Sequence, residues 1–269
     1  LQRLREWGGG EGMKFLTHAP HPALRAVVRT YWTLEGVAMP DQEERILPDG
    51  HGEIVIHLGD PFWHSNCPQP GSLWIGQMRT STDLSPRGRV SAFGVSFTPH
   101  GAAAFTRFPQ HETVDRIVPL EDVFPRDAWR ERLGNEPSLA ERVAAADEIL
   151  LRRFQRPPDR RFTRALAYLG QTRASIDSLA TQCGVSRRQL ERQFRSTTGL
   201  SPKTMHRIFR FQRTLGLRAA KPEESWAAIA AESGYYDQSH LIADFRQFSG
   251  GTPQGLEESF TELGRHFVR

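Results

Sequence analysis

An internal repeat near the C-terminal end constrains the fold of this chain more than any other sequence feature. Each copy contains an apolar residue followed by alanine, a glycine, a Phe-Arg pair, a second glycine and a Ser-Pro or Thr-Pro step. The copies are Leu179-Ala180, Gly184, Phe194-Arg195, Gly199, Ser201-Pro202 and Ile229-Ala230, Gly234, Phe245-Arg246, Gly250, Thr252-Pro253. Such glycines permit the left-handed turn that ends a helix, and proline after Ser or Thr suits a helix start. The spacing predicts two helix-turn-helix units, over about residues 175–199 and 225–250.

The second helix of each predicted unit has an apolar side and a polar side. In the first unit Leu190 and Phe194 fall on the side that faces the core. The opposite side carries long polar side chains, as a helix that reads base edges in a major groove requires. We predict DNA contacts by Arg187, Arg188, Glu191, Arg192, Arg195, Lys203, Arg207, Gln238, Ser239, His240 and Arg246. The alternative is that these side chains form the solvated faces of an ordinary helical bundle.

The charge of the chain is divided unevenly between its halves. Residues 1–150 hold 15 Lys and Arg against 20 Asp and Glu, a net charge of −5, whereas residues 151–269 hold 20 against 11, a net charge of +9. A basic segment favours a polyanionic partner, of which double-stranded promoter DNA is the simplest. Residues 202–219 predict one connecting helix, whose basic residues are expected to contact phosphates: Lys203, Arg207, Arg210 and Arg213.

Three stretches of the basic segment carry a family resemblance: Gly199 to Lys203 (GLSPK), Arg207 to Gln212 (RIFRFQ) and Gly234 to Pro253 (GYYDQSHLIADFRQFSGGTP). Together they resemble the DNA-binding domain of AraC/XylS-type transcription regulators, over residues 161–256. The resemblance implies a seven-helix domain that binds promoter DNA through two helix-turn-helix units. It places the base-reading positions at Arg188, Glu191, Arg192, Ser239, His240 and Ala243. Related sequences commonly carry arginine at the last of these positions, so the resemblance implies weaker base reading by the second unit.

The first half of the chain predicts β structure. Short aromatic or β-branched runs over residues 26–34, 53–58, 73–78 and 90–98 are separated by Gly- and Pro-rich turns. Helical periodicity follows over 101–108 and 138–154, and Pro157-Pro158 ends it. We therefore predict an α+β protein of two domains, a β-barrel or cupin-like domain with helices over 1–155 and an all-α domain over 156–269. Segments 47–58 and 93–104 resemble the sensor domains that precede such DNA-binding domains, which implies a regulatory role.

A small-molecule effector is the ligand that this first domain is expected to bind. Aromatic side chains near the mouth of a barrel would form an apolar pocket, and a few polar groups would orient the ligand in it. The predicted lining consists of Arg29, Tyr31, Trp32, His57, Trp63, Trp74 and Phe97. A second interpretation is that this domain only dimerises or binds another protein.

A metal-dependent cupin enzyme fused to a DNA-binding module is the third interpretation, because several possible ligands lie near the predicted strands: His51, His57, His64, Cys67 and His100. No His-x-His pair occurs, and neither Cys67 nor Cys183 has a recognisable catalytic partner. We expect no enzymatic reaction, no cofactor and no bound metal. The expected setting is cytoplasmic, without a membrane segment, as a monomer or homodimer that could also contact RNA polymerase.

Overall fold

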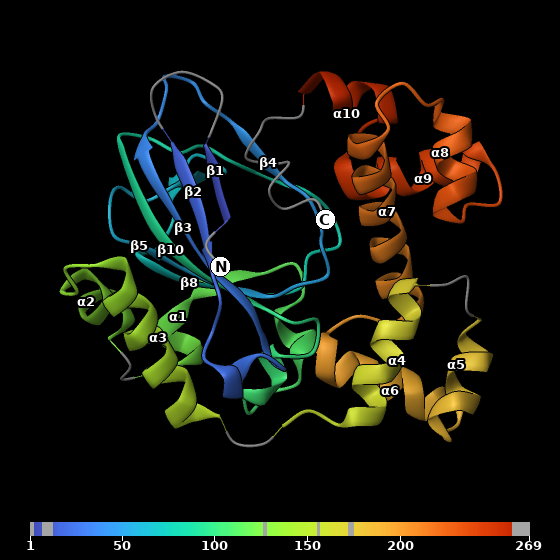
Figure 1. The fold of residues 1–269 in the computed structure, drawn as a ribbon, viewed down its shortest axis with the longest axis horizontal. Helices are drawn as coiled ribbons and strands as arrows, with labels where there is room; N and C mark the ends of the chain where they lie inside the picture. Colours follow the sequence, from blue (N-terminus) through green and yellow to red (C-terminus); the bar gives the residue numbers. More distant parts are fainter. Residues whose placement is uncertain (1–2, 7–12, 126–127, 155–156, 172–174, 260–269) are drawn as a thin grey trace.

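The computed structural model describes residues 3–6, 13–125, 128–154, 157–171 and 175–259. Figure 1 shows a β-rich lobe beside a helical lobe, with the first half of the chain in the former and the second half in the latter. This is the predicted α+β architecture of two parts. The predicted boundary between residues 155 and 156 lies outside the described residues, so the division at that point stays a prediction.

The β-rich lobe is built on an antiparallel sheet of seven strands in the order β1-β2-β3-β10-β5-β8-β11. Two small sheets of two strands each, β4 with β9 and β6 with β7, accompany it. All four predicted strand segments occur in the large sheet, as β3, β5, β8 and β10. The strands are β1 Arg3–Glu6, β2 Lys14–His18, β3 Val28–Val37, β4 Glu44–Ile46, β5 Glu53–His57, β6 Trp63–His64, β7 Cys67–Pro68, β8 Ser72–Ile75, β9 Thr82–Leu84, β10 Arg89–Phe97 and β11 Ile117–Pro119.

The large sheet buries both of its faces. One face packs with α1 Leu120–Val123, α2 Trp129–Gly134 and α3 Leu139–Arg153 into a core that includes Phe93 and Val95. The other face forms a second core with Trp32 and Leu34. Gly94 is required there, because a Cβ atom would collide with the indole of Trp32. Of the helix predicted over 101–108, only one 3-10 turn forms, η2 Ala102–Ala104; further 3-10 turns are η1 Pro22–Leu24 and η3 Gln110–Thr113.

The helical lobe contains seven helices within the described residues, the number that the resemblance implies. They are α4 Arg160–Gln171, α5 Ile176–Cys183, α6 Arg187–Thr198, α7 Pro202–Ala220, α8 Trp226–Ser233, α9 Gln238–Ser249 and α10 Pro253–Ser259. Serine or aspartate side chains cap the starts of α5 to α9, and a left-handed glycine follows α5, α6, α8 and α9. The helix boundaries are therefore encoded by local hydrogen bonding.

The two lobes share contacts that join distant parts of the sequence. Leu47, from the loop after β4, is buried in the apolar core of the helical lobe. The Gln212 side chain donates a hydrogen bond from Nε2 to the carbonyl oxygen of Pro48 at 2.7 Å. His100 packs edge-on against the ring of Phe162, 6.3 Å between centroids. The helical lobe is thus held against the β-rich lobe by specific packing.

Candidate nucleic-acid interface

The two helix-turn-helix units have matching backbone geometry. The amide of Val185 donates to the carbonyl of Ala180 at 3.1 Å, and the amide of Tyr235 donates to that of Ala230 at 3.0 Å. The units run from their first N-caps to their last glycines, Ser175 to Gly199 and Ser225 to Gly250. Figure 1 shows α7 as a rod with α5 and α6 at one end and α8 and α9 at the other. Nineteen residues at 1.5 Å per residue give α7 a length of about 28 Å.

The polar side of α6 is open to solvent. Leu190 and Phe194 are fully buried, so the helix phase predicted from the sequence is confirmed. Arg188, Arg192 and Arg195 are exposed on the opposite side. They line a groove of about 890 Å³, together with Glu191, Ser186, Gln189, Ser196, Pro109 and His111. The structure therefore brings the predicted base-reading side chains of α6 together in one concave surface.

Arg187 differs from its neighbours because it is already ion-paired. Its guanidinium lies 3.5 Å from the carboxylate of Asp177 and 3.3 Å from that of Glu191. Both pairs are exposed, so each contributes little to stability and could be exchanged for a phosphate contact. The arginines of α6 that line the groove are Arg188, Arg192 and Arg195. Arg187 is not part of its lining.

The polar side of α9 is also exposed, but it offers fewer long side chains. Gln238, Ser239, His240 and Arg246 are exposed, as predicted for DNA contacts. The His240 ring lies 2.9 Å from the N-cap carboxylate of Asp237, through Nδ1 and Oδ1. The backbone hydrogen bond from His240 and this ring contact lower the pKa of Asp237. Ala243, exposed on the same side, has no group that can hydrogen-bond to a base edge.

Arg207, which is predicted to contact a phosphate, is engaged inside the helical lobe. Its guanidinium and that of Arg210 each lie 2.7 Å from a different carboxylate oxygen of Asp244, a side chain that is only 3% exposed. Arg207 also donates to Oε1 of Gln247 at 2.7 Å. Arg213, a further predicted phosphate contact, donates to the carbonyl of Gly170. These arginines tie α7 to α9 and to α4, and Lys203 is the predicted phosphate contact that stays exposed.

Sequence reasoning missed the role of Asp244. A lone carboxylate among aromatic and basic residues of α9 was the available signal. Its partners lie 34 and 37 residues earlier in the chain, so their identity depends on how α7 crosses α9. The guanidinium of Arg210 also stacks over the ring of Tyr235 at 4.1 Å. The cluster therefore fixes the second recognition helix on α7 by an ion pair and by ring stacking.

The residues predicted to line an effector pocket do not share one. Tyr31, Trp74 and Phe97 are buried in the core that packs against the helices, whereas Trp32 lies in the core of the opposite sheet face. Adjacent residues of a strand point to opposite faces, which is why Tyr31 and Trp32 separate. The Tyr31 hydroxyl instead donates to Oδ1 of Asp147 on α3 at 2.6 Å.

The other residues predicted to line the pocket, His57, Trp63 and Arg29, each contact a different partner. His57 is fully buried, its ring faces the Gln69 side chain at 3.1 Å, and burial lowers its pKa to about 4. The guanidinium of Arg87 covers the ring of Trp63 at 4.0 Å. Arg29 lies 3.8 Å from the carboxylate of Asp49. A single barrel-mouth pocket formed by the seven predicted residues is therefore wrong.

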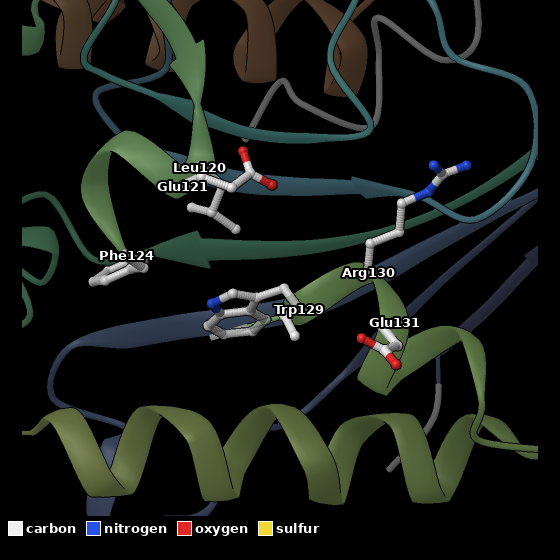
Figure 2. A pocket seen from close by; sticks show the side chains of 7 residues that line it. Leu120, Glu121, Phe124, Trp129, Arg130 and Glu131 are labelled. Carbon is white, nitrogen blue, oxygen red and sulfur yellow. The ribbon is translucent and has the colours of Figure 1, made fainter. Parts of the chain in front are cut away.

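The cavities of the β-rich lobe include one inside it and one beside it. Figure 2 shows the first, about 460 Å³ in volume, with Trp129, Arg130 and Glu131 on one side and Leu120, Glu121 and Phe124 on the other. Arg130 is used structurally, since its Nε donates to the carbonyl of His57 at 2.8 Å. The second, about 660 Å³, lies where the turns around Asp49, His51 and His100 meet α4 and α7.

Among the described residues, no group of three or more His, Cys, Asp or Glu side chains is arranged to hold a metal ion. Within the same residues, no helix combines the length and apolar character that a membrane crossing needs. Cys67 and Cys183 are both free thiols.

Two family models match parts of the chain, one in each lobe. Residues 16–119, from β2 to the end of β11, match a domain of unknown function (DUF6597), and residues 179–259 match a helix-turn-helix domain. No curated protein matches the chain in sequence.

Three solved structures are similar to the chain at low sequence identity. ToxT from Vibrio cholerae (P21 form) is 8% identical, with a TM-score of 0.47, covering 86% of this chain and 99% of ToxT. Wild-type ToxT from Vibrio cholerae strain SCE256 with bound unsaturated fatty acid is 9% identical, with a TM-score of 0.42 and coverages of 93% and 96%. The AraC-like transcriptional activator CuxR is 14% identical, with a TM-score of 0.29 and coverages of 82% and 86%.

Proposed function

We propose that this chain is an AraC-type transcription regulator that binds promoter DNA sequence-specifically through both α6 and α9, two helices of its helix-turn-helix domain. The observation that carries the proposal is the pair of capped recognition helices held on one rod, α7, each with its polar side exposed. A duplex presents successive major grooves about 34 Å apart on one side, so a rod of about 28 Å is suited to place one helix in each.

The proposed roles follow from side-chain length, charge and exposure. Arg188, Glu191 and Arg192 read base edges from α6, because arginine bonds O6 and N7 of guanine and glutamate accepts from cytosine. Ser239 and His240 read bases from the start of α9. The remaining exposed polar residues contact phosphates and set the register: Arg187, Arg195, Lys203, Gln238 and Arg246.

Selection of binding sites from random duplex DNA tests this proposal. We expect a motif of two segments about one helical turn apart, with the α6 segment the more strictly specified because Ala243 removes a base contact from α9. An Arg152→Ala variant, which removes an exposed charge of α3 instead, should select the same motif. Failure of the wild-type chain to enrich any sequence would contradict the proposal, and so would a motif of one segment only.

The second part of the proposal is that a small-molecule effector controls this DNA binding from the β-rich domain. The cavity of about 660 Å³ between the lobes supports it, because a ligand there would touch both the β-rich turns and the helices that carry the recognition units. Its lining mixes apolar groups such as Leu166 and Phe209 with Arg25 and Arg213. Arg29, which is predicted to bind the effector, is ion-paired with Asp49, and Asp49 lines this cavity.

Filling this cavity tests the effector proposal. A ligand at a hundred times its Kd stabilises the folded chain by about 2.7 kcal/mol, which a thermal-shift screen of small metabolites detects. We expect Ala167→Trp, in the cavity wall, to abolish the shift of any hit, and Ala227→Trp, exposed on α8, to preserve it. A hit that stabilises both variants equally binds elsewhere and contradicts this location.

A further inference from the structure

The turn of the second helix-turn-helix unit is one residue longer than that of the first. In the first unit the N-cap Ser186 follows Gly184 after one residue, whereas in the second the N-cap Asp237 follows Gly234 after two. The matching amide bonds to Ala180 and Ala230 pair Val185 with Tyr235, and both side chains pack into the helical core. The extra residue is therefore Tyr236, which has no counterpart in the first unit.

The side chain of Tyr236 projects into solvent at the start of α9. It is 92% exposed, more than the other exposed large hydrophobic side chains of the described residues, Val37, Met39 and Leu151. Its ring meets that of His240 edge-on, with the centroids 6.2 Å apart. The residues that follow it in the chain, Gln238 and Ser239, belong to the exposed end of α9. The extra residue thus extends the polar surface of α9 beyond its N-cap.

We propose that Tyr236 contacts the DNA backbone at the edge of the groove that α9 enters, donating a hydrogen bond from its hydroxyl to a phosphate oxygen while its ring packs on the adjoining sugar. This inference rests on the proposed function. Tyrosine hydroxyls and helix N-termini are both common phosphate ligands. A residue just before the N-cap lies outside the helix, so it reaches the groove edge while Ser239 and His240 face the bases.

The contact would offset the weakness of α9 as a base reader. Ala243 supplies no hydrogen bond, and Arg207 and Arg210 are held by Asp244. A neutral phenol positions the helix without releasing a counterion, whereas Lys203 and Arg246 release counterions when they bind phosphate. Tyr236 should therefore raise affinity on every sequence alike and leave the salt dependence unchanged.

Binding of the full chain to its selected site and to a scrambled duplex, at several salt concentrations, tests this inference. We expect Tyr236→Phe to weaken binding about 3- to 10-fold on both duplexes, as the loss of one hydrogen bond predicts, without changing the slope against salt. Tyr236→Ala should weaken binding further, because the ring contact is lost too. Met39→Ala, at an exposed apolar position of the β-rich lobe, should change neither affinity.

Ethylation of single phosphates locates the contact. One phosphate beside the α9 segment should weaken wild-type binding when ethylated and have no effect on Tyr236→Phe. Equal affinity of wild type, Tyr236→Phe and Tyr236→Ala would overturn the inference and leave the proposed function intact. A loss confined to one base pair would overturn the phosphate assignment in favour of base reading. Absence of any sequence-selective binding by the wild type would overturn the proposed function and this inference together.

Discussion

Three glycines that end helices of the helix-turn-helix units provide a matched test of how the two lobes are joined. Gly184, Gly199 and Gly250 have φ values of 66°, 85° and 76°, so alanine at any of them must adopt a left-handed conformation. A Cβ atom at Gly184 or Gly250 would meet nothing within 4 Å. At Gly199 it would lie 2.7 Å from Cγ2 of Val114 and 3.0 Å from the carbonyl oxygen of Gln110. Substitution of Gly199 therefore perturbs the contact between α6 and η3.

The magnitude follows from these distances. The left-handed conformation costs an alanine about 1–2 kcal/mol at each position. Carbon atoms pack best at about 3.5–4.0 Å, so a contact at 2.7 Å forces the neighbouring group to move, which typically costs about 1–3 kcal/mol more. Gly199→Ala should destabilise the chain by about 2–5 kcal/mol, and Gly184→Ala and Gly250→Ala by about 1–2 kcal/mol each.

Equilibrium unfolding of the three variants, followed by fluorescence, measures the difference. Val114→Ala removes the Cγ2 atom, so the double variant with Gly199→Ala should lose less stability than the two single variants together, by at least about 0.5 kcal/mol. Gly184→Ala combined with Val114→Ala should be additive. Equal destabilisation by Gly199→Ala and Gly184→Ala would refute the inferred packing of α6 against η3.

Four further outcomes are expected. Arg192→Ala should cost about 1–3 kcal/mol on the selected DNA site and relax one base position, as measured by repeated site selection. Asp244→Asn should destabilise the helical domain by about 2–4 kcal/mol in thermal unfolding, because it leaves two partly solvated guanidiniums without their carboxylate. Burial lowers the pKa of His57 to about 4, so as the pH falls the imidazole is protonated in the unfolded chain before it is protonated in the folded chain. The free energy of unfolding of the wild type should therefore decrease between pH 6.5 and 4, and this decrease should be about 3 kcal/mol smaller in His57→Gln. Urea unfolding at each pH measures the difference. Lys203→Ala should reduce the slope of DNA affinity against salt by about one, and Arg207→Ala by less, since Arg207 is bound to Asp244.

The sequence by itself determined the helix-turn-helix units and their reading faces. Ser186 and Gln189 form a reciprocal capping box, and Asp237 caps α9 through the amide of His240. Such signals act within four residues, and the burial of Leu190 and Phe194 follows from helical spacing alone. Four strands of the large sheet, β3, β5, β8 and β10, were also predictable, because their apolar runs are bounded by turn residues. The physical reason is that caps, turns and periodicity are local properties of the backbone.

Only the tertiary structure decided which long-range partner each polar side chain takes. Arg207 looked like a phosphate ligand because its charge and helical position fit that role, yet Asp244 binds it from α9. Tyr31 and Trp32 were predicted to line one pocket because they are adjacent in the sequence. The sheet buries both of its faces, and the two side chains lie in the cores on opposite faces. Leu47 enters the helical core from a loop far away in the chain. Pairings of this kind depend on how the lobes pack, and a pattern confined to a few neighbouring residues carries no information about them.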